Sequence, residues 1–302
     1  MENIKKAYIT SLSTENYLIG VLGLKECLDR VKAKYPFVVL VNNDISEESI
    51  NKLKEKDILV IKKEKIKIPE EIRKRNDEKL LSRWSNTFDK LSVFGLAEFE
   101  KLVYIDSDMY IRKNIDELFD KPHMSATIDR KNCCIDFNWM KMTSGLIVIE
   151  PKENLDLELI ETMKKVQEKY TEFGDQDVIQ WHYADWENHK ELHLPLKYNM
   201  FVLHLDYYVK HMNSEKSDCR DYEMYDLDDI AVYHFITRNK PWQYSPETIQ
   251  DYADFQDEIR QIDYDLCTDE EQRKMFEAAF KLGRDITKKI TLEYMEILNK
   301  VK

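Results

Sequence analysis

Two aspartates separated by one residue follow an apolar run near the middle of the chain. Residues 102–105 are strand-forming, and Asp106 and Asp108 come directly after them. Side chains two residues apart on a strand project to the same face, so both carboxylates can point at one spot. Close carboxylates raise each other's pKa, and a divalent cation such as Mg²⁺ or Mn²⁺ keeps both ionised. The pattern therefore predicts a metal site; the alternative is an acidic turn exposed to solvent.

A histidine and a lysine later in the chain could complete such a site. His234 follows the apolar run 230–233, and Lys240 comes a few residues later. An imidazole beside two carboxylates shifts the preferred metal from Mg²⁺ towards Mn²⁺. The sequence has six glycines and no glycine-rich phosphate-binding motif, so a bound phosphate would be met by the metal and the lysine. Either residue alone is more often a packed or solvated side chain.

The surrounding sequence alternates strand-like and helix-like stretches. Strands are expected at residues 7–10, 37–41, 58–61, 102–105, 125–128, 146–149 and 230–233. Helices are expected at residues 17–31, after a Ser46 cap, at 83–98 and 157–170, and from 175 onward, with a charged loop up to residue 75. This alternation is typical of βαβ units and predicts an α/β fold. Ligands of such sheets bind beyond the carboxyl ends of strands, where the turn after Thr10 and the two aspartates lie.

The last part of the chain has a different character. Residues 244–302 are dense in charged residues, and apolar residues recur at helical spacing at Met275, Phe276, Ala279 and Phe280. The pattern predicts a helical extension packed on a domain of residues 1–243, with formation of a homodimer as the weaker alternative.

Composition restricts the classes of partner and compartment. A net charge of −12 argues against a nucleic-acid partner. Five cysteines without a C-x-x-C spacing fit a reducing compartment better than a disulfide framework or a zinc site. No apolar run approaches the ~20 residues that span a bilayer, and the first residues lack the apolar segment of a signal peptide. These features predict a cytoplasmic protein without a membrane partner.

The motifs together resemble those of the glycogenin-like glycosyltransferases. The matching motifs, in order, are Thr10 and Tyr17, Lys90-Leu91, Tyr104-Ile105-Asp106-Ser107-Asp108, residues 115–119, Ser144-Gly145, Asp175-Gln176, Leu194-Pro195, Tyr198-Asn199, His234-Phe235 and Lys240-Pro241-Trp242. The resemblance implies a GT-A fold, a Rossmann-like nucleotide-diphospho-sugar transferase with a mostly parallel central sheet. It implies metal-dependent transfer of a hexose from a UDP-sugar to a hydroxyl acceptor, with retention of configuration. Mn²⁺ is expected, with Mg²⁺ as the alternative; glucose is favoured over galactose, and the acceptor is a glycan, a protein or a polyol.

The same resemblance implies roles for individual residues. The implied metal ligands are Asp106, Asp108 and His234. The residues implied to act at the transferred sugar are Lys90, Asp175 and Gln176. The implied donor-binding residues are Thr10, Ser13, Tyr17, Arg83, Tyr104, Asp106, Ser107, Asp129, Ser144 and Lys240. In this set Lys240 would hold the phosphates, Tyr17 and the turn near Ser13 would contact the uridine, and Asp129 would line the sugar pocket with Lys90.

Two positions depart from the family pattern. Thr143 stands where asparagine usually precedes Ser-Gly, so a contact to the sugar or acceptor is expected to differ. Residues 237–239 lack the usual glycine, which reduces the freedom of this loop, and Arg238 adds charge there. Retention leaves two routes open: Asp175 as a nucleophile, or front-face attack supported by Gln176 or a backbone carbonyl. Asp175 could instead be a helix N-cap.

Two other functions remain as alternatives. Haloacid-dehalogenase-like phosphatases also place D-x-D after an apolar strand, but on an early strand and with Thr or Val where this chain has Tyr110. A glycogenin-type primer that glucosylates itself is the second alternative, because Tyr207 and Tyr208 follow Asn199 at about the distance of the glucosylated tyrosine of glycogenin.

Overall fold

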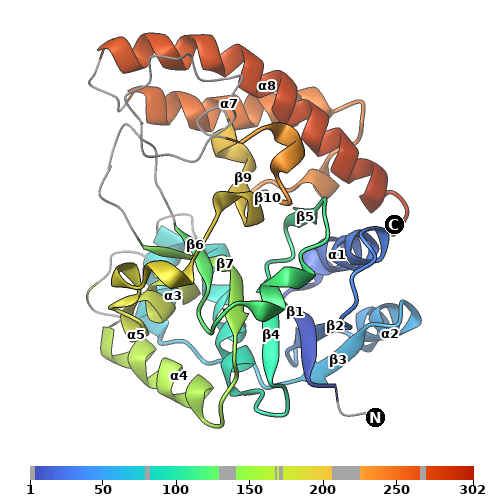
Figure 1. Cartoon of the computed structure of the whole chain (residues 1–302), viewed down its shortest axis with the longest axis vertical. Coiled ribbons are helices and arrows are strands. Elements are labelled where there is room, and N and C mark those ends of the chain that lie inside the picture. The colour runs from blue at the N-terminus through green and yellow to red at the C-terminus, as the bar shows by residue number, and fades with distance from the viewer. Residues whose placement is uncertain are drawn as a thin grey trace.

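The computed structural model describes residues 4–78, 82–128, 141–166, 169, 173–205, 225–265 and 270–302. A seven-stranded sheet lies at the centre of this part of the chain, with helices on both faces (Figure 1). A three-stranded sheet lies between the central sheet and the two C-terminal helices, α7 and α8.

The strands alternate with helices, as the sequence predicts. In the described residues the strands are β1 (Lys6–Leu12), β2 (Phe37–Val41), β3 (Leu59–Lys62), β4 (Lys101–Ile105), β5 (Met109–Ile111), β6 (Ala126–Ile128), β7 (Met142–Ile149), β8 (His193–Leu194), β9 (Met200–Phe201) and β10 (Val232–His234). The α-helices are α1 (Leu18–Arg30), α2 (Glu47–Glu55), α3 (Glu70–Glu78), α4 (Leu155–Val166), α5 (Asp175–His182), α7 (Ile249–Asp265) and α8 (Glu270–Leu298). The 3₁₀ helices are η1 (Glu15–Tyr17), η2 (Ser82–Asn86), η3 (Phe88–Gly95), η4 (Asp116–Asp120), η6 (Trp186–Asn188), η7 (Lys190–Leu192), η8 (Leu196–Tyr198), η9 (Val202–His204), η10 (Leu227–Asp229) and η11 (Pro241–Gln243).

The central sheet has the strand order β3-β2-β1-β4-β7-β6-β8. Neighbours are parallel from β3 to β4 and again between β6 and β8. Strand β7 runs antiparallel to both β4 and β6. The expected α/β architecture with a mostly parallel sheet is confirmed. The smaller sheet has the order β5-β10-β9, and it places the end of β10 beside the start of β5.

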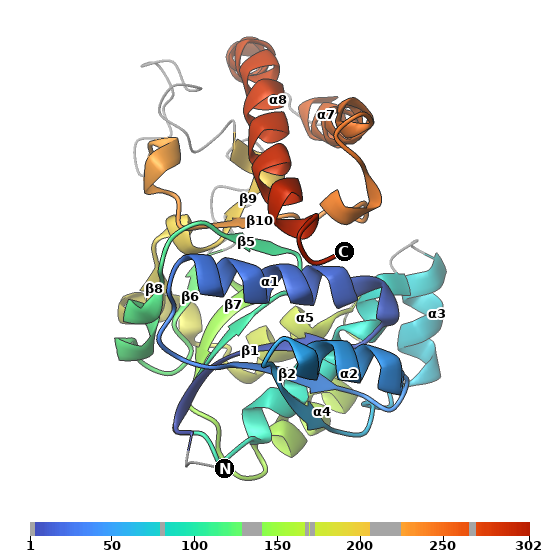
Figure 2. The same ribbon diagram turned by 90° about the vertical axis from the view of Figure 1, so that its right-hand side faces the viewer.

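The two faces of the central sheet are covered by different helices. Along β1, Tyr8 and Leu12 pack with α1 and α2, which lie across the sheet in Figure 2. Ala7 and Ile9 alternate with them and pack with η3, α4 and α5 on the opposite face. This alternation follows from the two-residue period of a strand. The alternation also determines which residues at the end of β1 can reach the cleft described in the next subsection.

Several elements differ from the sequence-based expectation. Residues 83–98, expected as one helix, form η2 and η3, and η3 ends at Gly95. In η3 the charged side chains of Asp89 and Lys90 are buried with tertiary partners, and such contacts override local propensity. The charged loop expected up to residue 75 instead contains α3, whose single buried apolar residue, Ile72, gives no helical periodicity. Strand β1 continues to Leu12, so the turn after it is shorter than expected.

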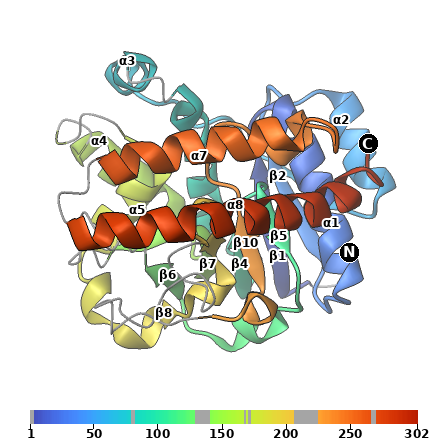
Figure 3. The same cartoon turned by 90° about the horizontal axis from the view of Figure 1, so that it is seen from above.

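The C-terminal helices α7 and α8 lie side by side across the top of the molecule (Figure 3). Helix α8 packs closely on α1 at Gly23, where an added Cβ would lie 2.7 Å from the side chain of Leu298. The Tyr294 ring of α8 stacks on Phe235, which follows β10, at 5.4 Å between centroids. The side chains of residues 275, 276, 279 and 280 lie outside the described part of the structure, and the division of the chain at residue 243 stays a prediction. Among the described helices, none is both long and apolar enough to cross a membrane.

Candidate active site

A cleft of about 770 Å³ opens beyond the carboxyl ends of β1 and β4. The residues of the sequence-based site that line it are Ser13, Tyr17, Arg83, Lys90, Tyr104, Asp106, Ser107, Asp108, Ser144, Asp175, Gln176, His234 and Lys240. The structure therefore brings these residues together from segments spread over most of the chain. Asp129 lies outside the described residues. The position of the cleft is the one expected for a ligand of a parallel sheet.

Thr10 does not line the cleft. Its side chain is completely buried, and it shares a strand face with Tyr8 and Leu12, which pack towards α1. Ser11 lines the cleft instead, and its hydroxyl is 2.9 Å from the Tyr104 hydroxyl. The sequence analysis missed Ser11 because it ended the strand at Thr10. Extending the expected strand by one residue would have placed Ser11 on the strand face opposite to that of Thr10.

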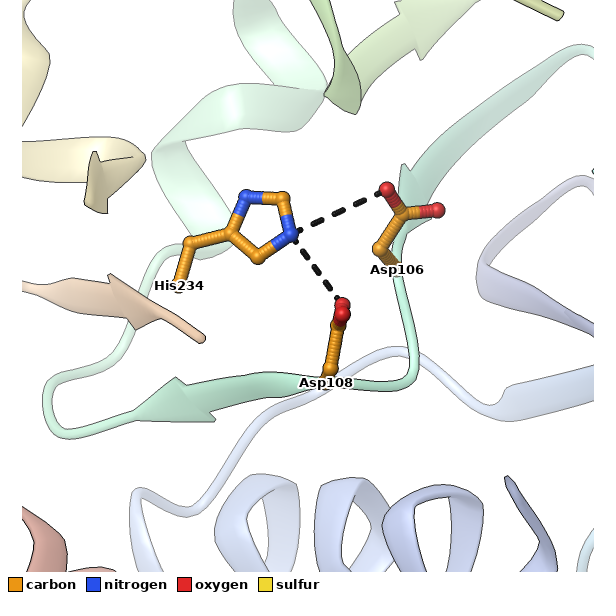
Figure 4. A group of neighbouring side chains, drawn as sticks. All are labelled: Asp106, Asp108 and His234. Atoms are coloured by element: carbon orange, nitrogen blue, oxygen red, sulfur yellow. Dashed lines mark hydrogen bonds and ion pairs between the residues drawn. The ribbon is translucent and has the colours of Figure 1, made fainter. Parts of the chain in front are cut away.

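Asp106 and Asp108 lie in the turn between β4 and β5, so the turn rather than strand alternation brings their carboxylates together. The Asp106 N–H donates to the Gly145 carbonyl of β7 at 2.8 Å. The N–H of Phe235 donates to the Asp108 carbonyl at 3.0 Å. His234 is the last residue of β10 and pairs with Met109 at the start of β5. Two sheets thus hold the three side chains against one another (Figure 4).

These three side chains could hold a metal ion. The His234 Nε2 atom is 3.1 Å from Asp108 Oδ1 and 3.9 Å from Asp106 Oδ2, and one ligand atom from each residue lies within 4.8 Å of the others. The Nδ1 atom of His234 is 2.9 Å from the Asn199 side-chain oxygen, so Nε2 is the nitrogen directed at the carboxylates. Two carboxylates and one imidazole form a donor set that suits Mn²⁺, and the outer hydrogen bond is typical of a metal-binding histidine. The residues present therefore fit a divalent ion.

Lys240 contacts the carboxylate oxygen of Asp108 that His234 does not contact. Its buried ammonium is 2.6 Å from Asp108 Oδ2 and donates to the Phe235 carbonyl at 2.7 Å. Burial alone would raise the pKa of Asp108, but the charges of Lys240 and His234 outweigh it and hold that pKa well below its usual value. The Tyr17 ring is 5.9 Å from the same ammonium. A positive charge therefore lies next to the candidate metal ligands, with an aromatic ring beyond it.

Lys90 connects the candidate metal ligands to the start of α5. Its side chain is only 3% exposed, and its ammonium lies 3.0 Å from Asp106 Oδ1 and 2.7 Å from Asp175 Oδ2. It also donates to the Ser144 hydroxyl at 3.1 Å. Burial opposes the charged form of Lys90, but Asp106 and Asp175 outweigh this and raise its pKa above the usual value. The ammonium is thus charged and held between two carboxylates.

Asp175 and Gln176 are the first residues of α5, and both line the cleft. Asp175 is not the N-cap, so that alternative is wrong: Gly174 is the cap residue, and its N–H donates to the Asp177 carboxylate at 2.8 Å. The Asp175 carboxylate instead accepts from Ser144 Oγ at 2.8 Å. Burial raises the pKa of Asp175, but the Lys90 charge outweighs it, so the pKa is lowered. The Gln176 side-chain oxygen accepts from the Ser144 N–H at 3.0 Å.

Arg83 reaches the cleft from η2. Its guanidinium is half-buried and has no carboxylate partner among the described residues, and burial lowers its pKa. An unpaired cation in a cleft is suited to an anionic ligand. The cleft residues that the sequence analysis missed include Asn16, Trp84, Asn86, Thr87, Gln180 and Ile236. They carry no motif, and only their three-dimensional proximity to the cleft identifies them.

A family model matches the part of the chain that builds this cleft. The model of glycosyl transferase family 8 matches residues 8–245. The chain belongs to this family. Membership indicates a nucleotide-sugar glycosyltransferase and confirms the family resemblance seen in the sequence. The phosphatase alternative loses its support.

Similar proteins and structures agree with the family. Galactinol synthase 2 of Arabidopsis thaliana is 26% identical over 274 residues, covering 80% of this chain and 75% of that protein. Uncharacterized protein R707 of Acanthamoeba polyphaga mimivirus is 29% identical over 254 residues, covering 78% and 82%. The galactosyltransferase LgtC in complex with donor and acceptor sugar analogs has a TM-score of 0.55 at 16% identity, with 90% of this chain and 95% of that chain covered.

The glycosyltransferase GlyE of Streptococcus pneumoniae TIGR4 has a TM-score of 0.54 at 20% identity. That match covers 80% of this chain, which spans 58% of the length of GlyE. At these identities the structural likeness shows the fold alone, and the fold is that of GT-A glycosyltransferases.

Proposed function

We propose that this protein transfers a hexose from a UDP-sugar to a hydroxyl acceptor with retention of configuration, in a reaction that requires a divalent metal. Mn²⁺ is the expected ion and Mg²⁺ the alternative. The observation that carries the proposal is the convergence of Asp106, Asp108 and His234 in a cleft that also contains the Lys240 ammonium. This combination suits a diphosphate, which is the charged part of a UDP-sugar.

The residues of the cleft divide into a phosphate end and a sugar end. Asp106, Asp108 and His234 would hold the ion, which when bound supplies charge stabilisation to the UDP leaving group. Lys240 and Arg83 would contact the phosphate oxygens from outside the metal site. Both side chains are partly or fully withdrawn from solvent, which strengthens such contacts. Their role is to stabilise the negative charge that develops as the glycosidic bond breaks.

At the sugar end, the contacts of Asp175 favour front-face attack by the acceptor over a covalent intermediate. The same Asp175 oxygen lies 2.7 Å from the Lys90 ammonium and accepts from Ser144 Oγ at 2.8 Å. A carboxylate stabilised in this way is a weak nucleophile, because its negative charge is already neutralised. We infer that Asp175 and Lys90 position the sugar and that Gln176 supports the charge on the reacting carbon.

The names of similar proteins change the expected order of donor sugars. The sequence analysis placed glucose before galactose, whereas the similar proteins include galactinol synthases and a galactosyltransferase. We therefore propose UDP-galactose as the first donor to test and UDP-glucose as the second.

The deciding experiment is a panel of UDP-sugars assayed for UDP release with Mn²⁺. The acceptors are a short glucan, a hydroxylated peptide and a small polyol, with galactinol as a reference for the product. We expect one UDP-hexose to react fastest and the anomeric configuration of the product, read by NMR, to be that of the donor. Product with the opposite configuration would contradict the retaining mechanism, and no UDP release from any donor would contradict the proposed function.

Transfer to a separate acceptor, rather than to the protein itself, is the second part of the proposal. Tyr207 and Tyr208, the candidate self-acceptors, lie outside the described residues. Residues 249–265 and 270–298 form helices. We expect the Tyr207→Phe, Tyr208→Phe double variant to transfer sugar to an added acceptor at close to the parent rate. A folded double variant that binds donor but makes no product would favour self-glucosylation.

A further inference from the structure

A row of three buried polar side chains lies behind His234. Asn199, just before β9, is 2% exposed, Thr143 in β7 is 3% exposed, and Thr127 in β6 is fully buried. The Asn199 oxygen is 2.9 Å from His234 Nδ1, and the Asn199 nitrogen donates to Thr143 Oγ1 at 2.8 Å. Thr143 Oγ1 is in turn 2.8 Å from Thr127 Oγ1 and 3.3 Å from the Thr127 carbonyl. The row therefore connects His234 through β7 to β6 of the central sheet.

The donors and acceptors in this row determine the direction of its hydrogen bonds. A backbone carbonyl only accepts, so Thr143 donates its one hydrogen towards Thr127 and accepts from the Asn199 NH₂ group. The remaining end of the Asn199 amide is its oxygen, which also only accepts. His234 therefore donates from Nδ1, which directs Nε2 at Asp106 and Asp108. Without metal the Asp108 carboxylate accepts a hydrogen from Nε2, and a bound ion would take the place of that hydrogen.

We propose that Thr143 is a positioning residue for the metal site: its hydroxyl orients the Asn199 amide, which holds the His234 ring with Nε2 available to the ion. This inference rests on the proposed function, because it concerns the same metal. It also gives a reason for the departure at position 143. The Thr143 side chain does not line the cleft and points to Asn199 and Thr127, so its contribution to the reaction is made through His234.

Thr143→Val removes the hydroxyl with little change in shape. The Asn199 NH₂ group then loses its acceptor, and the amide can turn to present NH₂ to His234 Nδ1. That arrangement keeps a hydrogen on Nε2, where it blocks metal binding. Loss of the outer partner of a metal-binding histidine typically weakens metal affinity by roughly 10–100-fold, and we expect a loss of that size when the Asn199 amide turns away from its present orientation. Thr143→Ser keeps the hydroxyl and should restore the affinity to within roughly threefold of the parent.

The matched control is Thr291→Val. Thr291 is also fully buried, its hydroxyl donates to the Thr287 carbonyl at 2.7 Å inside α8, and it does not line the cleft. The same substitution there removes a buried hydrogen bond of the same kind without touching the row behind His234. It should leave the Mn²⁺ affinity unchanged.

The experiment measures Mn²⁺ binding in the presence of UDP by calorimetry for the four proteins. A loss of at least tenfold in Thr143→Val, with Thr143→Ser and Thr291→Val close to the parent, supports the proposal. Equal affinity in Thr143→Val and the parent would overturn it, and so would an equal loss in both valine variants. A parent protein that does not bind Mn²⁺ would contradict the proposed function itself, and the inference with it.

A second measurement uses only the metal-free parent protein. In the parent protein, NMR should show a hydrogen on His234 Nδ1 that exchanges slowly with water, because that nitrogen is buried against Asn199. A metal-free parent without a protected Nδ1 hydrogen would overturn the proposed orientation.

Discussion

Replacing Lys90 by methionine tests the electrostatic centre of the cleft. Methionine has nearly the length of lysine but carries no charge, so Lys90→Met removes the ammonium and leaves most of the packing. The ammonium contacts Asp175 at 2.7 Å and Asp106 at 3.0 Å, and all three residues line the same cleft. Without it, two carboxylates remain in a partly desolvated site with no metal to compensate them.

The size of the effect follows from these distances. At an effective dielectric constant of ~20, a unit charge pair near 3 Å gains roughly 6 kcal/mol, and the cost of desolvating each ion offsets several kcal/mol of this. Breaking a buried pair by removing one partner costs about 3–5 kcal/mol in measured cases. We expect Lys90→Met to lower the free energy of unfolding by about that amount at pH 7.

Urea unfolding of the metal-free protein measures this loss. The control is Lys25→Met, which breaks the pair with Asp29 one helical turn away on α1; such pairs contribute about 0.3–0.5 kcal/mol. Adding Asp175→Asn to Lys90→Met should recover part of the stability, because it removes one uncompensated charge. If Lys90→Met loses no more stability than Lys25→Met, the ammonium does not hold the two carboxylates as described.

Three further predictions follow from the geometry. In Gly145→Ala the new Cβ would lie 2.7 Å from the His234 ring and displace this metal ligand. The Mn²⁺ affinity measured by calorimetry should therefore fall at least roughly tenfold. An unchanged affinity would show that the ring has room to move. Lys240→Ala should weaken UDP binding in Mn²⁺ by about 1.5–3 kcal/mol, the value of a charge-assisted contact, and unchanged UDP affinity would make Lys240 a structural residue. Burial lowers the pKa of His123 to about 4, and its ring lies 2.9 Å from the Tyr183 hydroxyl. Between pH ~6.5 and pH ~4 the unfolded chain therefore binds a proton at His123 that the folded chain does not. The free energy of unfolding should lose nothing to this residue above pH ~6.5 and fall by up to about 3 kcal/mol towards pH ~4. Urea unfolding as a function of pH should show a smaller decrease for His123→Gln.

The sequence predicts the fold more completely than it predicts the individual contacts. Strand β2 occupies the expected residues, and Ser46 caps α2 by accepting from the Ser49 N–H at 3.2 Å, because both signals are local. Residues 83–98 were predicted wrongly as one helix, since the inward turn of Lys90 depends on carboxylates that are distant in sequence. Helix α3 was missed because it buries one apolar residue and shows no periodicity.

The candidate site shows the same limit. The metal triad could be proposed from residue types and their order, because D-x-D and a later histidine are visible in the sequence. The contact between Asn199 and Thr143 joins residues 56 positions apart, and no local pattern connects them. Thr10 was assigned to the donor site by the family resemblance, whereas its side chain is buried and the neighbouring Ser11 lines the cleft.

The most direct test of the central claim is the rate of UDP release from the best UDP-hexose as a function of free Mn²⁺, in the parent and in Asp108→Asn. UDP release in the parent should saturate with Mn²⁺ and disappear under excess chelator. No Mn²⁺-dependent release is expected in Asp108→Asn. Its free energy of unfolding should also fall, because the buried Lys240 ammonium loses its carboxylate partner, so the assay is run under conditions in which circular dichroism shows the variant to be folded. Full activity in Asp108→Asn, or in the parent under saturating chelator, would contradict a metal-dependent transfer at this site.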